Sequence, residues 1–401
     1  MAWAERLGNF IWNPWLLGLF LLCGLYFSVR TGFFQVFRAP LWLKTTLGSL
    51  LRREKRREGE GLTRLQALST ALAATIGTGS IAGVATAIFY GGPGAVFWMW
   101  VSAFLGMMTG CLEKTLTVRY REKDPAGGWR GGPMCYMEKG LGSRGLACLF
   151  ALCCVCANLG GGNVVQANSI AAALEASFGW NRLAVGIVTA AMRYGVARGV
   201  FTNEAGMGTS AIAHAASNTR DPAEQGMWGI FEVFIATICV CSVTALVILT
   251  SGVYQEGAAL AAIQAGTVTR AMTGAPLSAA AFSTVYGPFG GAFVSVCLLL
   301  FAFTSLLGTS YYGERGLQYL TGSDRWKLPF RAAFLAAIVA GSVGDVAVVW
   351  QLADIFNGLM ALPNLCALLA LSPEALSLLK SWTEAKTGAA GRPGRRRSQR
   401  R

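Results

Sequence analysis

The amino-acid sequence contains a series of nearly uncharged apolar stretches, each close to the length of about 20 residues that a helix needs to cross a bilayer. They cover residues 11–29, 66–90, 94–112, 146–174, 226–252, 285–312, 332–349 and 352–372. A ninth stretch, 184–215, begins apolar but is interrupted by Arg193 and Arg198. Only 13% of the residues are charged, against about a quarter in soluble domains. These features predict an all-α polytopic membrane protein.

Basic residues gather in alternate connections between the apolar stretches. They are Arg52, Arg53, Lys55, Arg56, Arg57, Lys114, Arg119, Arg121, Lys123, Arg130, Lys139, Arg315, Arg325, Lys327, Arg331 and the arginines of 395–401. The connection 252–284 contains only Arg270. Because cytoplasmic loops carry the excess of Lys and Arg, we expect a plasma (inner) membrane protein with its N-terminus outside and its C-terminus cytoplasmic. The net charge of +14 is then explained by basic residues on the cytoplasmic side, near anionic lipid. Nucleic acid is therefore not an expected partner.

Residues 70–90 form one apolar run with small residues at its centre, Gly77-Thr78-Gly79-Ser80. One interpretation is a membrane helix broken at this point, since freed backbone groups are tolerated in lipid only where they line an enclosed cavity or bind a ligand. The alternative is an unbroken helix that packs closely on its neighbours through small residues. The segment by itself leaves both interpretations open.

Six motifs in order along the chain resemble the alanine/glycine:cation symporter family. They are Gly77-Thr-Gly-Ser-Ile-Ala-Gly83, Gly91-Gly-Pro-Gly-Ala-Val-Phe-Trp-Met-Trp100, Gly131-Gly-Pro-Met134, Gly162-Asn-Val-Val-Gln-Ala-Asn-Ser169, Arg198-Gly-Val-Phe-Thr-Asn-Glu-Ala-Gly-Met-Gly208 and Ala361-Leu-Pro-Asn-Leu365. The resemblance implies a leucine-transporter-type fold, in which an extra first helix precedes two inverted five-helix repeats. It also implies that sodium, or sometimes protons, drives the uptake of alanine, glycine and similar small neutral amino acids.

The same resemblance indicates an internal deletion near residues 189–193. Family members complete a fifth helix and add a sixth before the motif at Arg198, and roughly eighty residues are absent here by the length of those helices. We therefore expect about nine spans instead of about eleven. Because an even number of spans is lost, the two termini keep their predicted sides of the membrane. The expected divisions are a transmembrane domain, residues 1–380, and a basic cytoplasmic tail, residues 381–401. Within the domain they are an extra helix 11–29, a partial first repeat 64–192 and a second repeat 193–372.

The resemblance also assigns site residues. It places Thr78, Gly79, Gln166, Ser305 and Thr309 at the substrate, and Gly77, Ser80 and Asn203 at the cation. A half-helix N-terminus favours the substrate carboxylate, and unwound carbonyl oxygens suit a hard cation. Ser80 replaces the family's usual Asn. Ser305 and Thr309 replace the usual Thr and Trp, and the loss of an aromatic ring at 309 should widen the pocket. The alternative for these two residues is hydrogen bonding between helices, which needs no substrate.

Two ionisable residues remain open to more than one interpretation. Glu204 is a candidate for ion coupling, because an ionisable group within a span is functional by default, and equally for an ion pair with Arg193 or Arg198. His214, the single histidine, could carry a proton, although a position capping a helix end near Arg220 is favoured.

No Walker loop, dinucleotide fingerprint or metal-ligand spacing is present, so we expect neither an enzyme nor a cofactor other than a transported sodium ion. The leading hypothesis is a sodium-coupled symporter impaired by the missing segment. The alternative is a decayed or non-transporting paralogue that acts as a membrane subunit or sensor.

Overall fold

The computed structural model describes residues 14–50, 69, 76–124, 128–159, 204–343 and 346–388. Within them the chain is almost wholly helical, and the sheet structure is one antiparallel pair of two-residue strands. The elements are α2 (Pro14–Arg30), α3 (Phe34–Phe37), α4 (Ala39–Leu50), η1 (Thr78–Ser80), α6 (Ala82–Gly91), α7 (Gly94–Tyr120), β1 (Glu122–Lys123), β2 (Trp129–Arg130), α8 (Pro133–Lys139), α9 (Arg144–Ala157), α12 (Thr209–Ala215), α13 (Pro222–Val233), η3 (Phe234–Cys241), α14 (Ser242–Thr250), α15 (Glu256–Gln264), η4 (Arg270–Met272), α16 (Gly274–Tyr286), α17 (Pro288–Thr321), η5 (Asp324–Trp326), α18 (Lys327–Val343), α19 (Val346–Ala370) and α20 (Ser372–Thr387).

Three of the described helical stretches are long and apolar enough to cross a membrane: Gly94–Tyr120, Pro222–Thr250 and Pro288–Thr321. A fourth span results if Ile355–Ala370 and Ser372–Thr387 are taken together across their 61° bend. Each of them overlaps a stretch that the sequence predicts to be a span. The prediction of an all-α, multi-pass membrane protein is thereby confirmed at this level.

Helices continue beyond the apolar stretches, and this corrects the sequence prediction at three places. α7 ends at Tyr120 and α17 at Thr321, so Lys114 and Arg315 lie within helices and not in loops. Lys114 can remain in a helix interior because carboxylates lie within 3.4 Å of it. α20 runs through Thr387, beyond the end of the last apolar stretch at residue 372.

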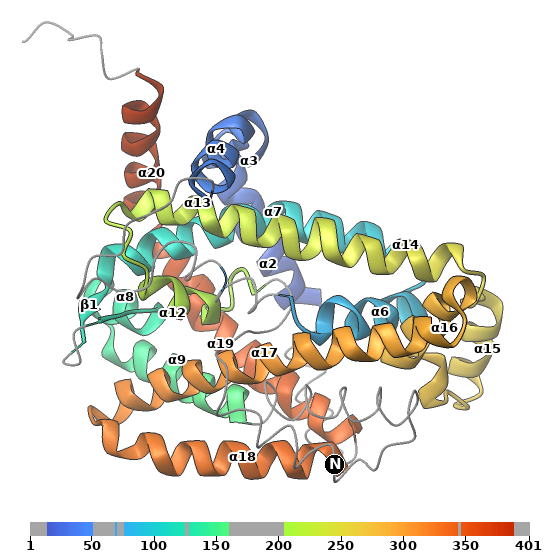
Figure 1. Ribbon diagram of the computed structural model, residues 1–401. Coiled ribbons are helices and arrows are strands. Elements are labelled where there is room, and N and C mark those ends of the chain that lie inside the picture. Colours follow the sequence, from blue (N-terminus) through green and yellow to red (C-terminus); the bar gives the residue numbers. More distant parts are fainter. Residues whose placement is uncertain are drawn as a thin grey trace, which may run out of the picture.

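α13, η3 and α14 form one continuous rod (Figure 1), of which α13 and η3 pack against α7. Small residues allow the close approach. A Cβ atom added at Gly229 of α13 would lie 2.5 Å from the carbonyl oxygen of Gly110 in α7, closer than such atoms can approach. The α7–α13 contact therefore depends on the absence of a side chain at this position, as in small-residue helix contacts within membranes.

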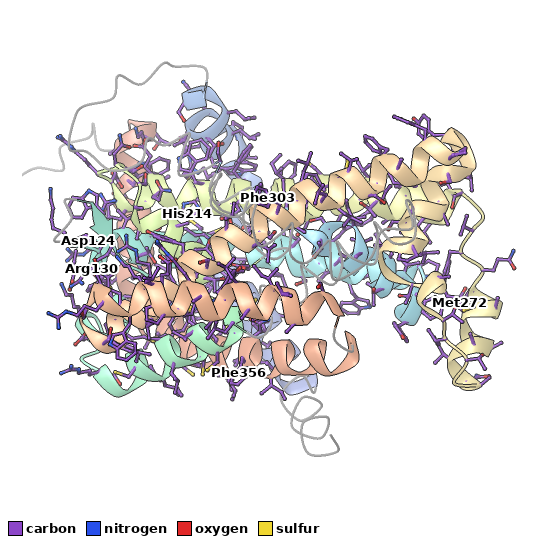
Figure 2. All side chains as sticks on the ribbon, turned by 60° about the horizontal axis from the view of Figure 1, so that its bottom comes forward. Asp124, Arg130, His214, Met272, Phe303 and Phe356 are labelled. Carbon is purple, nitrogen blue, oxygen red and sulfur yellow. The ribbon has the colours of Figure 1, made fainter. Side chains whose placement is uncertain are left out.

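The connections separate to two ends of the molecule. β1 and α8 lie at one end, and α15 and α16 approach the other (Figure 1). Figure 2 shows Asp124 and Arg130 at the first end and Met272 at the opposite end. The basic connection 113–144 and the sparsely charged connection 252–284 thus occupy opposite ends, as the sequence pattern requires.

Candidate functional site

The α-helical structure does not run through the glycine-rich centre of residues 70–90. α6 begins only at Ala82, and the described residues before it contain a single 3₁₀ turn, Thr78–Ser80. Gly77 has an extended backbone with φ −105° and ψ −163°. The amide of Ser80 donates to the carbonyl of Gly77 at 3.1 Å, and that of Ile81 to the carbonyl of Thr78 at 3.2 Å. The chain is therefore not α-helical at Gly77–Ser80, while residues 70–75, the other side of the predicted break, lie outside the described residues.

Three other elements enclose this turn. The hydroxyl of Ser278 in α16 donates to the carbonyl oxygen of Ile81 at 3.1 Å. The hydroxyl of Ser80 is hydrogen-bonded to the thiol of Cys241 at the end of η3, and both η3 and α17 pack against η1. η3 is a π-helix of eight residues, a distortion that is frequent at functional sites. The non-helical turn is thus held inside the protein and away from lipid.

Two buried hydroxyls of these surrounding elements have no hydrogen-bond partner among the described residues. They belong to Ser305 of α17 and Thr237 of η3. Leaving a buried polar group unpaired costs about 1–3 kcal/mol, so each hydroxyl is suited to receive a polar ligand or water. Thr309, one turn after Ser305, differs because its hydroxyl donates to carbonyls of its own helix, those of Ser305 and Leu306.

A half-open, apolar groove of about 240 Å³ lies beside Ile81, the residue that follows the turn. Ile81 forms one wall, Phe282 of α16 a second, and Phe293, Cys297 and Phe301 of α17 a third. Ser305 follows Phe301 by one helical turn, about 6 Å along the axis. One wall of this space and the unpaired hydroxyl of Ser305 therefore belong to the same helix, one turn apart.

The other predicted site residues are placed as follows. Thr78 and Ser80 are buried, and Gly79 is half-buried. Gln166 and Asn203 lie outside the described residues, as do Arg193 and Arg198. Glu204 is 3% exposed and accepts a hydrogen bond from the hydroxyl of Thr209.

A cluster of buried charged groups, which we call the charge cluster, lies between α7, α12 and α13. It consists of Glu113, Lys114, His214 and Glu232, each at most 1% exposed. The ammonium of Lys114 is 3.4 Å from a carboxylate oxygen of Glu113 and 3.3 Å from one of Glu232. His214 Nε2 is 3.2 Å from the same oxygen of Glu232. His214 lies in the last turn of α12 near Arg220, as the sequence favours, but its ring does not cap that helix end, because it contacts Glu232 and Gln225 of α13.

Asn364 connects the charge cluster to the sequence motif in α19. Its amide nitrogen donates to Glu113 at 2.7 Å and to the carbonyl of Gly206 at 2.8 Å, while its amide oxygen accepts from the hydroxyl of Tyr136. The sequence analysis missed this cluster. The signal was available, because Glu113, Lys114 and Glu232 interrupt otherwise apolar stretches, and ionisable groups there are rarely without a role.

Beyond the end of α7, Arg121 holds the turn that follows α12. Its guanidinium donates to the carbonyls of Ala215, Ser217 and Thr219 and stacks 4.3 Å from the ring centre of Trp129. Burial lowers the pKa of Arg121 to about 10, which leaves it charged at neutral pH.

Sequence comparisons with known proteins identify the family of the chain. The profile of the Sodium:alanine symporter family matches residues 1–192 and 174–393. The sodium/alanine symporter AgcS of Methanococcus maripaludis is 36% identical over 96% of this chain and 98% of its own length. The protein of Bacillus subtilis named probable sodium/glutamine symporter GlnT is 33% identical over 94% of this chain and 90% of its own. The alignment with AgcS spans 459 positions, more than the 401 residues of this chain. The chain belongs to the sodium:alanine symporter family.

Proposed function

We propose that the protein binds small neutral amino acids such as alanine or glycine together with sodium, at the turn Gly77–Ser80. The observation that carries this proposal is the non-helical turn enclosed by α16, η3 and α17. Backbone N–H groups at Thr78 and Gly79 would bind the substrate carboxylate. Carbonyl oxygens of the same turn, with Gly77, Ser80 and Asn203, would hold the sodium ion.

The amino acid would extend from the turn toward α17. Ser305 supplies a buried hydroxyl without a partner among the described residues, and an amide such as that of Gln166 supplies both donors and an acceptor for the ammonium and carboxylate groups. Thr309 lies on the same face of α17 as Ser305. Since Thr is smaller than the family's usual Trp, the site would admit side chains larger than that of alanine.

The chain would remain less active as a transporter than its longer relatives. The relatives align over more positions than this chain has residues, which supports the loss of a segment near 189–193. Loss of two crossings would leave the first repeat incomplete, and alternating access depends on the paired movement of the two repeats. Binding would survive, because the turn and its enclosing helices lie outside the lost segment.

Substrate binding to the purified full chain tests the proposal. In the leucine variant Gly79→Leu, side-chain atoms would fill the space where the carboxylate approaches, so sodium-dependent binding of labelled alanine should be abolished. The matched control is Gly83→Leu in α6, where an added Cβ meets no atom within 4 Å, and its binding should be retained. Equal binding by both variants and the unmodified protein would contradict the proposed site.

A further inference from the structure

The charge cluster carries an unbalanced charge within the protein interior. Glu113 and Glu232 are two carboxylates, Lys114 is one ammonium, and His214 is uncharged in its neutral form. Buried charges are stable only when they are paired. A single added proton on the imidazole would therefore bring these four groups to neutrality.

The partners of His214 determine where a proton can be taken up. Nε2 faces the carboxylate of Glu232, and Nδ1 faces the side-chain amide nitrogen of Gln225. The amide oxygen of Gln225 accepts from the hydroxyl of Thr219 at 2.7 Å. With this orientation Nδ1 is an acceptor, so the neutral ring carries its hydrogen on Nε2 and donates it to Glu232.

A second arrangement of the same groups fits the protonated ring. If the amide of Gln225 turns over, its oxygen accepts from Nδ1–H and its nitrogen donates to Thr219 Oγ1. The Thr219 hydroxyl can then donate to Ser217, which lies 2.8 Å away, where either oxygen can be the donor. No hydrogen bond among His214, Gln225, Thr219 and Ser217 is lost in this exchange.

We propose that His214 and Glu232 form a proton-binding site, in which the imidazole takes up one proton and the amide of Gln225 turns over to accept it. The hydroxyls of Thr219 and Ser217 lead from the ring to the turn that Arg121 clamps. That turn continues into the exposed Arg220. The hydrogen-bonded groups therefore extend from the ring to the turn beside Arg220, at the end of the molecule that carries β1 and α8.

The charged groups around His214 come from α7, α13 and the segment before α12. α13 contributes Glu232, α7 contributes Lys114 and Glu113, and the segment before α12 contributes Glu204. Other charged groups of the packed elements are engaged elsewhere: Glu314 with Arg331, Arg315 with Asp124, Glu138 with Tyr319 and Arg130 with Glu122. Of these neighbours, Glu232 alone is in contact with the ring through an acidic oxygen among the described residues.

The single histidine makes the site directly observable. The full chain, purified without a histidine tag and labelled with ¹⁵N-histidine, should give one set of ring signals across about pH 5 to 8. We expect a reversible titration with Nε2–H as the neutral tautomer. In Glu232→Gln the proton should bind about tenfold more weakly or worse, because the facing carboxylate is lost.

The matched control is Glu224→Gln, which removes a carboxylate from the same helix, α13, where it lies 3.9 Å from Lys386. Its titration should equal that of the unmodified protein. Gln225→Leu removes the amide and should also weaken proton binding, and it provides a second variant if Glu232→Gln does not fold. A ring that stays neutral across the range, or equal titrations for Glu232→Gln and Glu224→Gln, would overturn the proposal. The spectra need no transport, so their outcome is independent of the proposed symport.

Discussion

Ser305 and Thr309 lie one turn apart in the same helix, and their hydroxyls differ in hydrogen bonding. Both are buried in α17, but Thr309 is satisfied by carbonyls of its own helix. Ser305 has no partner among the described residues. A buried hydroxyl without a hydrogen-bond partner lowers the stability of the fold. It contributes to the affinity for a ligand that forms this hydrogen bond.

We therefore expect Ser305→Ala to weaken sodium-dependent alanine binding by up to about tenfold without lowering the thermal stability of the protein. Thr304→Val is the matched control, because the hydroxyl of Thr304 already donates to the carbonyl of Phe301 at 2.9 Å. Scintillation binding assays and thermal unfolding in detergent measure the two quantities. A loss of stability in Ser305→Ala with unchanged alanine binding would show that this hydroxyl serves the fold alone.

Glu122 gives a pH dependence outside the membrane-spanning helices. Lys139 at 2.6 Å, and then Arg130 at 2.9 Å, hold the pKa of this carboxyl below its ordinary value. A lowered pKa in the folded state means that the pairing stabilises the protein above the ordinary pKa and that this stability is lost as the pH falls through the lowered value. The group is partly exposed, so its contribution should stay below about 1 kcal/mol.

Thermal unfolding of the unmodified chain and of Glu122→Gln should accordingly differ at neutral pH and converge in acid. The variant cannot ionise at this position, so it lacks the stabilisation at every pH. A difference in melting temperature that persists unchanged in acid would show that the ion pairs of Glu122 are not its source.

Among the helices, the seam between α7 and α13 depends on glycine more than on polar contacts. Gly229→Ala should destabilise the protein by about 1–3 kcal/mol, despite the gain of about 1 kcal/mol that Ala gives in a helix. The reason is the 2.5 Å approach of the added Cβ to Gly110. The control is Gly257→Ala in α15, which meets no atom within 4 Å and should be neutral or slightly stabilising in thermal unfolding. Equal thermal stability of both variants would mean that the contact between α7 and α13 can accommodate an added methyl group.

The helices could be predicted, and a non-helical Gly77–Ser80 is one of two interpretations, because both depend on local sequence. Apolar length gives the spans, and the small residues of Gly77–Ser80 weaken a helix wherever it packs. The positions of Lys114 and His214 could not be predicted in this way. Counting basic residues treats each of them as solvated, whereas the partner of both, Glu232, lies far from Lys114 in sequence and is brought near by the packing of α13 on α7.

As a whole, the molecule keeps the enclosed turn and the charge cluster, and its alignment with AgcS spans more positions than the chain has residues. The turn is enclosed by α16, η3 and α17, and the cluster by α7, α12 and α13. Neither of these two sets of helices includes the segment that we propose is lost near residues 189–193. Binding and transport are thus expected to separate in this chain, with binding retained and transport impaired.

Alanine uptake into proteoliposomes under an inward sodium gradient separates these two capacities most directly. The unmodified chain should take up labelled alanine slowly or not at all. Insertion of the corresponding segment of a full-length relative between Thr189 and Met192 should raise the rate, and that uptake should vanish when sodium is replaced by potassium. If uptake by the restored chain did not depend on sodium, the proposed sodium coupling would be contradicted. If the unmodified 401-residue chain took up alanine equally fast under the sodium gradient, its impaired transport would be contradicted.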